Sequence, residues 1–402
     1  MIRSAARTSL MAFVFLLALG ACSTTSEPAP TVAAPAPPPA PTPTAIPFDE
    51  AVRKAAQDVL DNAKLAADQK YAVVIDPLVD GNTGIQTVAT ASMQKTVEQI
   101  IKSQFQQLEV RPFGSGTVAT LPLIMVGTFT PINLQGKADG ERDAYRICFA
   151  LADMKTGKII SKGLARSLPD GFDPTPLPLF RDFPVWTKDA AVEGYVKTCQ
   201  GTKAGDPINP AYVDAIVAAA AINEAAAAYS GKRYKDALAL YQSALRNPAG
   251  NQARVHAGIY LTQQKLGRKP LAMRAFASLA EQGLTNDRLA IRFEFKSGAT
   301  AFAGDSRTYM PWLKEITRQS LAIGSCLEIA GHSRRSASPQ LDERLSLQRA
   351  EFVRQKMIEA SPDFANRSSA IGYGSQKLLI GTGKNNNSDA LDQRVEFRKT
   401  SC

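Results

Sequence analysis

The chain has 402 residues, of which 45% are hydrophobic and 21% are charged, so it has enough apolar residues for well-packed cores. Its formal net charge of +10 at pH 7 would suit nucleic acid. No basic run is interleaved with aromatic residues, however, so we exclude nucleic acid as a partner. An anionic envelope polymer or a lipid head group is the better partner for this positive charge.

The N-terminus has the pattern of an export signal. Arg3 and Arg7 precede an apolar run from Leu10 to Leu19, and two small residues follow it. This run has about half of the roughly 20 residues that a membrane-spanning helix needs. We therefore predict a signal peptide over residues 1–21, which export removes.

The sequence Leu-Gly-Ala-Cys at residues 19–22 resembles the lipobox of bacterial lipoproteins. The resemblance implies that the Cys22 thiol carries lipid, with acyl chains such as palmitate, and each buried methylene then contributes about 0.8 kcal/mol to membrane binding. Ser23, and not Asp, follows the cysteine, which by the same resemblance favours the outer membrane. The alternative is an ordinary cleaved signal in which Cys22 has no role.

Residues 22–47 follow as a predicted tether. From Ser23 to Pro47 the chain consists almost wholly of Pro, Ala, Thr and Ser, which cannot bury enough apolar surface to fold. Such a segment favours extended polyproline II at about 3.1 Å per residue, so it could span roughly 75 Å. We predict a spacer that holds the rest of the protein away from its anchor.

Residues 48–205 have the pattern of an α/β domain. Helices with an apolar spacing of about 3.6 residues alternate with short, continuously apolar strands. The predicted elements are a helix over 48–64, a strand over 71–75, a helix with apolar positions from 97 to 108, a strand over 121–129 and a hairpin over 145–160. Their order resembles the periplasmic domain of CsgG-like and LpoB-like lipoproteins.

The segment from Gly171 to Trp186 is rich in proline and aromatic residues and shows no periodicity. One interpretation is an ordered loop folded over its own domain. The other interpretation is a surface that docks a partner protein.

Residues 210–284 are predicted to be helical. Small and aromatic residues recur with a period of about 35 residues, at Tyr234, Ala237 and Tyr241 and again at Ala272 and Phe276. This spacing resembles tetratricopeptide repeats, with one full unit and part of a second. Because such units need neighbours that bury their faces, the segment serves either as a groove for a partner peptide or as a helical spacer.

Besides Cys22 the chain has four cysteines, and an oxidising periplasm favours disulfides between them. Four cysteines allow three pairings, among which sequence alone does not choose. Membership of the same predicted domain suggests Cys148 with Cys199 and Cys326 with Cys402. Free buried thiols are the alternative.

The most specific pattern of the chain lies in residues 331–353. It resembles the core motif of OmpA-like peptidoglycan-binding domains, which reads G-H-T-D and, after a variable stretch, N-x-x-L-S-x-x-R-A. Six residues fall in register with this motif: Gly331, His332, Leu345, Ser346, Arg349 and Ala350. A shorter match at residues 392–396 resembles the N-R-R-V-E that begins the family's last strand. The resemblance implies an OmpA-like domain over residues 290–402.

In this family the ligand is the diaminopimelate of the peptidoglycan stem peptide. The motif's aspartate binds the ammonium of diaminopimelate, and the arginine that Arg349 matches binds its carboxylate through a bidentate guanidinium. Arg334 stands at the aspartate position in this chain, with Arg335 beside it. Because a cation repels an ammonium, we do not expect the usual mode of diaminopimelate binding.

Two carboxylates stand where the family has asparagine. Asp342 replaces the asparagine of the core motif and Asp392 replaces that of N-R-R, so a carboxylate could approach the ligand from another side. The candidate peptidoglycan-binding residues are therefore Arg349, Ser346, Asp342, Arg334 and Arg394.

Catalytic residues are scarce, since the chain has only two histidines. His256 is predicted to be a packed or surface residue of the helical segment, and His332 a structural residue of the motif. Residues 381–384, Gly-Thr-Gly-Lys, lack the spacer of a phosphate-binding loop and are interpreted, with Asn385 to Asn387, as a flexible surface loop. We predict no enzymatic activity, no cofactor and no bound metal.

These patterns predict an α+β chain of several domains: an α/β domain, a short tetratricopeptide-like helical region and an OmpA-like mixed sheet with helices on one face. The predicted role is that of an outer-membrane lipoprotein that faces the periplasm, associates with peptidoglycan and tethers or scaffolds envelope components. The alternative is a periplasmic regulator of a cell-wall synthase or of a secretion assembly. Such a regulator would bind a periplasmic protein through the α/β and repeat domains.

Overall fold

The computed structural model describes residues 44–133, 135–138, 140, 142–185, 188–303, 306–381 and 389–402. The predicted signal peptide, Cys22 and most of the predicted tether lie outside these residues, as do Trp186 and residues 382–387 of the predicted surface loop. The described residues belong to one compact unit. The domain boundaries predicted within it stay a prediction.

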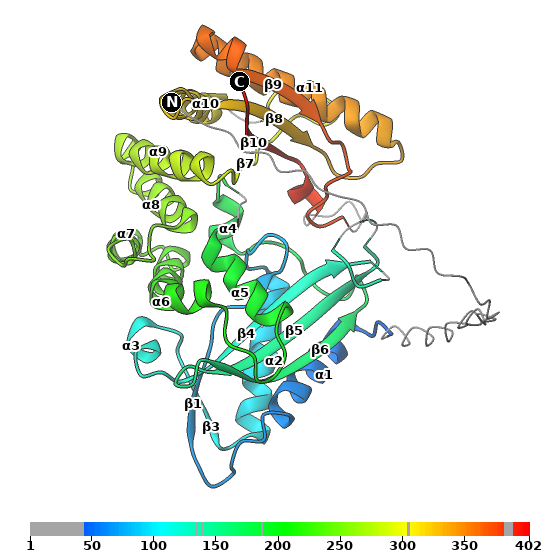
Figure 1. Cartoon of the computed structure of the whole chain (residues 1–402), viewed down its shortest axis with the longest axis vertical. Coiled ribbons are helices and arrows are strands. Elements are labelled where there is room, and N and C mark those ends of the chain that lie inside the picture. Colours follow the sequence, from blue (N-terminus) through cyan, green and yellow to red (C-terminus); the bar gives the residue numbers. More distant parts are fainter. Residues whose placement is uncertain are drawn as a thin grey trace, which may run out of the picture. The chain divides into compact units, whose positions relative to one another are not determined.

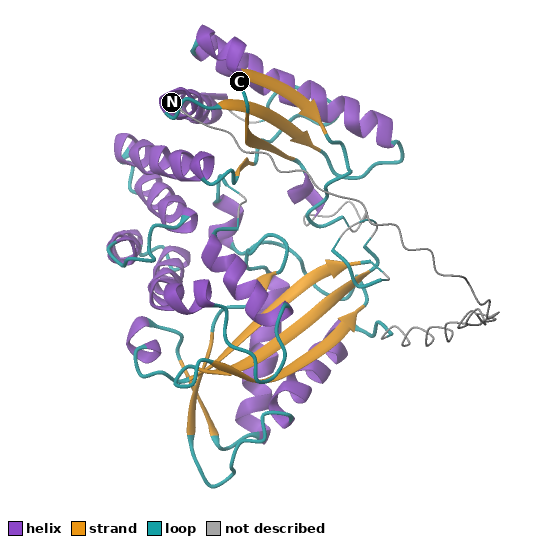
Figure 2. Cartoon of the chain, in the orientation of Figure 1, coloured by secondary structure: helices purple, strands orange, loops and turns teal. Residues whose placement is uncertain are grey.

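Six strands form the first sheet (Figures 1 and 2). They are β1 (Tyr71–Ile75), β2 (Val79–Asp80), β3 (Leu108–Arg111), β4 (Leu123–Ile132), β5 (Ala144–Asp153) and β6 (Lys158–Ser167). Their order is β3-β1-β4-β5-β6, and β2 also pairs with β4. β1 is parallel to β3 and β4, whereas β4, β5 and β6 are antiparallel neighbours, so the sheet is mixed.

Helices cover both faces of this sheet. They are α1 (Phe48–Asp61), α2 (Val88–Gln104), α3 (Ser115–Val118), α5 (Ala190–Gln200) and α6 (Pro210–Ser230), while the short α4 (Pro178–Asp182) packs on α6. Because side chains alternate along a strand, Val73 and Ile75 of β1 pack with α1 and α2, whereas Val74 packs with α5 and α6. Coverage on both faces explains why the sequence of β1 is continuously apolar.

Two local features determine how closely α1 packs on the sheet and where α2 begins. α1 lies directly against β6, because a Cβ atom on Gly163 would come within 1.8 Å of the carbonyl oxygen of Ala55. Thr87 and Thr90 exchange side-chain to backbone hydrogen bonds in a capping box at the start of α2.

Two predicted boundaries were wrong. The helix predicted through residue 108 ends at Gln104, and Leu108 instead begins β3. β3 is a four-residue strand at the edge of the sheet in which only Leu108 is buried, so its sequence is too short to show strand alternation. Leu121, predicted to begin a strand, has a φ of 53°, and β4 begins two residues later.

Three further helices follow α6, namely α7 (Tyr234–Leu245), α8 (Ala253–Lys265) and α9 (Lys269–Thr285). Consecutive helices pack against each other, and Gly258 of α8 leaves room for the ring of Tyr241 from α7. Their helical structure is as predicted, and the likeness to tetratricopeptide repeats stays a prediction.

Helix α6 is apolar on two sides. Tyr212 and Ile216 join the core beneath the first sheet, whereas Ile222 and Tyr229 join the core of the following helices. By length and composition α6 is the one helix in the described part of the chain that could cross a membrane, but 50% of its apolar window is buried by the protein. Packing on two cores therefore accounts for its apolar sequence.

The second sheet has four strands in the order β7-β10-β8-β9. Its elements are β7 (Leu289–Ile291), α10 (Ser306–Ala322), β8 (Cys326–His332), α11 (Pro339–Ala360), the 3-10 helix η1 (Pro362–Arg367), β9 (Ser368–Gly372), the 3-10 helix η2 (Asp389–Asp392) and β10 (Arg394–Thr400). β8 and β9 are parallel, and β10 is antiparallel to β7 and β8. Leu327 and Ile329 share one core with residues of α10 and α11, so this is the predicted mixed sheet with helices on one face.

Candidate functional site

The motif residues lie where β8 meets α11. Gly331 and His332 end β8, and α11 begins after Ser338, whose hydroxyl accepts a hydrogen bond from the Leu341 amide. A Cβ atom on Gly331 would lie 2.1 Å from the Ser346 carbonyl oxygen, so the motif glycine lets α11 contact the strand. The motif therefore fixes the distance between the helix and the sheet.

A cavity of about 350 Å³ opens beside the first turns of α11. Arg334, Asp342 and Arg349, three of the five candidate binding residues, line it together with Phe295 and Gln393. The structure thus brings these three residues together, whereas Ser346 and Arg394 lie elsewhere. We call this space the α11 cavity.

Arg349 forms a wall of the α11 cavity and is 5% exposed. Its Nε donates to the carbonyl oxygen of Ala299 at 3.1 Å and its Nη2 to that of Lys296 at 3.4 Å. The guanidinium also lies over the Phe295 ring, 4.7 Å from its centroid. Burial lowers the pKa of Arg349, and the positive charge of Arg334 lowers it further.

Arg334, at the position of the motif aspartate, is half-buried and makes no hydrogen bond or ion pair with any described residue. Asp342, by contrast, is held in place. Its Oδ2 accepts hydrogen bonds from the Ser336 amide at 2.9 Å and from the Ser375 hydroxyl at 3.0 Å. The α11 cavity therefore has one cation free of protein partners beside a carboxylate that the protein already engages.

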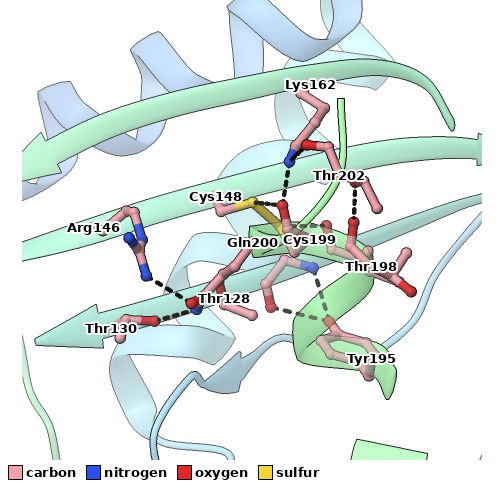
Figure 3. The surroundings of a disulfide bond; sticks show 12 residues. Thr128, Thr130, Arg146, Cys148, Lys162, Tyr195, Thr198, Cys199, Gln200 and Thr202 are labelled. Carbon is pink, nitrogen blue, oxygen red and sulfur yellow. Dashed lines mark hydrogen bonds between the residues drawn. A yellow bond between two sulfur atoms is a disulfide. The ribbon is translucent and has the colours of Figure 1, made fainter. Parts of the chain in front are cut away.

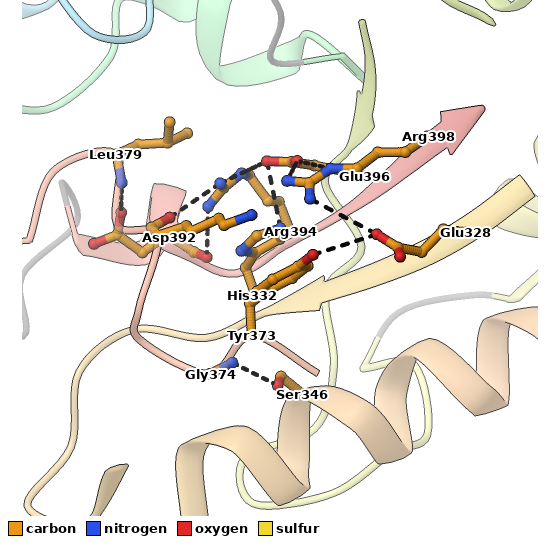
Figure 4. Close-up of polar contacts among 11 residues, drawn as sticks. Glu328, His332, Ser346, Tyr373, Gly374, Leu379, Asp392, Arg394, Glu396 and Arg398 are labelled. Atoms are coloured by element: carbon orange, nitrogen blue, oxygen red, sulfur yellow. Dashed lines mark hydrogen bonds and ion pairs between the residues drawn. The ribbon is translucent and has the colours of Figure 1, made fainter. Parts of the chain in front are cut away.

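Ser346 is fully buried and braces the backbone. Its hydroxyl donates to the Glu343 carbonyl oxygen at 2.8 Å and accepts from the Gly374 amide at 2.9 Å (Figure 4). Gly374 has a φ of 51°, and a Cβ atom there would lie 2.7 Å from the Glu343 amide nitrogen. Ser346 therefore fixes the turn after β9 on α11.

Arg394 lies on the face of the sheet opposite the helices. It pairs with His332 across β10 and β8, and its guanidinium contacts Glu396 Oε1 at 2.6 Å (Figure 4). Asp392 is also engaged elsewhere, since its carboxylate accepts from the amides of Leu379, Ile380 and Gly381. Neither residue lines the α11 cavity.

His332 is a packed residue, as predicted. Its ring stacks on Tyr373 with centroids 5.3 Å apart, and its Nε2 lies 3.4 Å from Glu396 Oε1. Burial lowers the pKa of His332 to about 4. Burial opposes ionisation of Glu396 as well, but hydrogen bonding to His332 and the charge of Arg394 hold the pKa of Glu396 below its usual value.

The structure contains both predicted disulfides. Cys148 of β5 bonds to Cys199 of α5 (Figure 3), and Cys326 at the start of β8 bonds to Cys402. Near the first bond, Gln200 of α5 donates to the hydroxyls of Thr128 and Thr130 in β4. These contacts and the disulfide hold α5 on the sheet.

The structure also shows the contacts of part of the proline-rich and aromatic segment and of His256. In the segment predicted as an ordered loop or docking surface, the Phe172 ring lies between those of Phe48 and Tyr145, at centroid distances of 5.1 and 5.0 Å. The loop therefore folds over its own domain at this residue. His256 is buried, and its Nε2 lies 2.8 Å from Asn251 Oδ1.

No protein-family model and no curated protein sequence matches this chain. Among solved structures, the periplasmic domain of Helicobacter pylori MotB aligns with 28% of this chain and 74% of its own, with 17% identity and a TM-score of 0.23. The OmpA-like domain of FopA1 from Francisella tularensis subsp. tularensis SCHU S4 aligns with 28% of this chain and 76% of its own, with 15% identity and a TM-score of 0.22. These likenesses are too slight to support a function, so the proposal below starts from the residues of the α11 cavity.

Proposed function

We propose that this chain is a non-catalytic envelope lipoprotein whose C-terminal segment associates with peptidoglycan. The observation that carries the proposal is the position of Arg349. It matches the ligand-binding arginine of the OmpA-like motif, and its side chain lines the α11 cavity. A guanidinium can bind a carboxylate there through two parallel hydrogen bonds.

Arg349 keeps donors for such a ligand. Its Nη1 makes no hydrogen bond to any residue that the structure describes, and the bond from Nη2 to Lys296 is long at 3.4 Å. A ligand carboxylate could bind Nη1 and replace the Lys296 carbonyl at Nη2. The Nε bond to Ala299 would meanwhile hold the guanidinium in place.

The charges of the α11 cavity favour an anionic group over an ammonium. Arg334 and Arg349 are both cationic, and the carboxylate of Asp342 is already bound by Ser336 and Ser375. Peptidoglycan stem peptides carry carboxylates as well as an ammonium. We propose that the cavity binds a stem-peptide carboxylate and does not use the family's usual contact to the ammonium.

The rest of the proposal concerns the N-terminal part. Cys22 would carry the lipid, and the Pro-rich tether would let residues 48–402 reach the cell wall from the outer membrane. Support for this comes from the lipobox-like sequence and the composition of residues 23–47. Replacing Cys22→Ser should leave the protein unprocessed or soluble, and mass spectrometry of the wild-type protein should show acyl chains.

Sedimentation with purified, diaminopimelate-containing sacculi tests the wall-binding part. We expect the full-length protein to sediment and Arg349→Ala to bind at least about tenfold more weakly, since a charge-assisted bidentate contact is lost. Arg344→Ala is the matched control, because Arg344 lies on the same helix and is exposed. Equal binding of a correctly folded Arg349→Ala protein would end the proposal.

A further inference from the structure

A second cavity, of about 70 Å³, lies at the carboxyl end of β1. Asp76 and Pro77, which directly follow the strand, line it on one side. Four helices contribute one large side chain each to the lining: Tyr195 from α5, Tyr212 from α6, Tyr241 from α7 and Arg254 from α8. We call this space the Asp76 cavity.

The sheet topology makes this a suitable place for a ligand. β1 lies between its parallel neighbours β3 and β4. The connection from β1 to β3 runs through β2 and then α2, which packs on one face of the sheet. Phe113 and Val118, in the connection from β3 to β4, pack on the other face. In open sheets with parallel strands, ligands bind outside the carboxyl ends where successive connections diverge in this way.

Asp76 provides a buried carboxyl group that can accept further hydrogen bonds. Its side chain is 7% exposed, and its Oδ2 accepts a hydrogen bond from the Tyr212 hydroxyl at 2.6 Å. Its Oδ1 accepts none, and no cationic side chain of the described residues forms an ion pair with it. Natural proteins rarely bury a carboxylate without a cation or several hydrogen-bond donors.

The one cation in the lining is already balanced. Arg254 Nε donates to Gln252 Oε1 at 2.7 Å and lies 3.7 Å from Asp189 Oδ2. Asp189 also lines the cavity, so the charges of Arg254 and Asp189 offset each other. The charge of Arg254 also lowers the pKa of Asp76, but burial raises this pKa more, so an ionised Asp76 is only partly balanced.

The Tyr241 hydroxyl is a second, independent observation that indicates a ligand in this cavity. It is fully buried and has no hydrogen-bond partner among the described residues, although the large majority of buried side-chain polar atoms in proteins have one. The ring itself is fixed by α8, because Gly258 leaves no room for a Cβ atom against it. The hydroxyl therefore cannot turn away to find water without repacking two helices.

The remaining walls are mostly apolar and aromatic, with Thr83, Gln86 and Asn223 as further polar residues. Leu179, Phe183 and Ile222 are buried among them, and the rings of Tyr195 and Tyr212 meet edge to face with centroids 5.4 Å apart. The hydroxyl of Tyr195 is engaged by the backbone of Gly127 (Figure 3 shows Tyr195 beside the disulfide). Since one water occupies roughly 10–15 Å³ of such volume, the cavity has room for about five non-hydrogen atoms.

We propose that the Asp76 cavity binds a primary alkylammonium group on a chain of about four carbons. The ammonium would donate to Asp76 Oδ1 and to the Tyr241 hydroxyl oxygen, which supplies the partners that both groups lack. Its charge would balance that of Asp76 beside aromatic rings, which attract cations. The alkyl chain would lie against Leu179, Phe183 and Ile222.

Such a group could belong to a free amine or to the lysine side chain of a peptide. Isothermal titration of the full-length protein with n-butylammonium chloride and with Nα-acetyl-lysine-N-methylamide tests both sources. Saturable binding of either compound is expected, and the tighter of the two identifies the source. No saturable binding of either one overturns the proposal.

Variants test the role of Asp76. Asp76→Asn keeps an oxygen that can accept from Tyr212 but removes the charge, so n-butylammonium should bind at least about tenfold more weakly. Asp182→Asn is the matched control, because Asp182 also accepts a tyrosine hydroxyl bond, from Tyr229 at 3.0 Å, but does not line the cavity. Equal binding by wild-type protein and Asp76→Asn, or binding of sodium butyrate as tight as that of n-butylammonium, overturns the proposal.

The pH dependence gives a readout that a purely structural role of Asp76 would not produce. Burial raises the pKa of Asp76 to about 7 in the free protein, while the ligand amine stays protonated below about pH 10. The groups that face Asp76 are Tyr195, Tyr212, Tyr241, Arg254 and Asp189. Affinity for n-butylammonium should rise about tenfold from pH 6 to pH 8 as Asp76 ionises, and a flat profile overturns the proposal.

Discussion

Arg349 donates through Nε to the carbonyl oxygen of Ala299 across 3.1 Å, and this bond joins α11 to the segment that follows β7. The arginine proposed to bind the ligand therefore also supports one wall of the α11 cavity. Binding and stability must be measured separately for any variant at this position.

Arg349→Ala should lower the free energy of unfolding by about 1–3 kcal/mol, because two carbonyl oxygens lose a charged donor. Arg349→Lys keeps the charge but cannot reproduce the fork of donors, so it should bind sacculi weakly while losing less stability. Urea unfolding of both variants, compared with Arg344→Ala, checks the first point. Full stability in Arg349→Ala would show that the contacts to Ala299 and Lys296 contribute nothing.

Arg334→Asp should strengthen the binding of diaminopimelate-containing muropeptides by about tenfold. The substitution removes the cation that repels the ligand's ammonium and places a carboxylate at the motif position. It also removes the charge that lowers the pKa of Arg349. Titration of the variant with muropeptides checks this, and Arg344→Asp, an equal charge change on the exposed side of α11, should have no effect.

Cys402→Ser should destabilise the C-terminal sheet. The Cys326–Cys402 bond closes a loop with a sequence separation of 76 residues. In the loop-closure model, such a bond contributes about 4 kcal/mol. Denaturant unfolding of the oxidised protein and of the variant measures the difference, and an unchanged midpoint would contradict the expectation.

His332 should make the protein less stable in mild acid. Its pKa is lowered from 6.5 to about 4 by burial, so the unfolded chain takes up a proton at a higher pH than the folded one. The contribution is fully present above pH 6.5 and is lost as pH falls toward 4, by up to about 3 kcal/mol. His332→Phe, which can keep the stacking on Tyr373, should lose less stability over this window when both proteins are unfolded in urea.

Asp76 should make the stability of the protein depend on pH in the opposite direction. Burial raises its pKa from 3.8 to about 7, so stability is lost as pH rises from 3.8 to 7. The full penalty, up to about 4 kcal/mol, is present only above pH 7. Asp76→Asn should therefore stabilise the protein more at pH 8 than at pH 5, and equal gains at both values would contradict the burial of an ionisable group.

The sequence predicted the fold best where a pattern of residues is compatible with few local structures. The apolar run of β1 predicted a buried strand, and the motif from Gly331 to Ala350 predicted, by resemblance, a mixed sheet with helices on one face. The cysteine pairs in the structure are those that membership of the same predicted domain suggested. In each case local chemistry and packing favour the same arrangement.

The position of Arg394 was not predicted, although the sequence contains the signal. Val395 and Phe397 are apolar, so alternation along β10 places Arg394 and Glu396 on the opposite face, away from α11. The motif match alone could not show this, because it orders residues along the chain and not around a strand.

The Asp76 cavity could not be predicted, because its walls come from segments far apart in the chain. Asp76 follows a buried strand, which was visible, but Tyr241 and Arg254 reach it from helices α7 and α8. No local sequence pattern predicts how α7 and α8 pack. A tyrosine in a repeat-like helix is ordinarily a core residue, and only the structure shows its hydroxyl without a partner.

The pairing of β7 has a mechanical consequence for the proposed tether between outer membrane and cell wall. The chain enters the second sheet through β7, which pairs with β10 over three residue pairs, whereas β10 pairs with β8 over seven. The Cys326–Cys402 bond further joins β8 to the end of β10. A pulling force transmitted along the chain should therefore detach β7 first and leave β8, β10 and α11 folded.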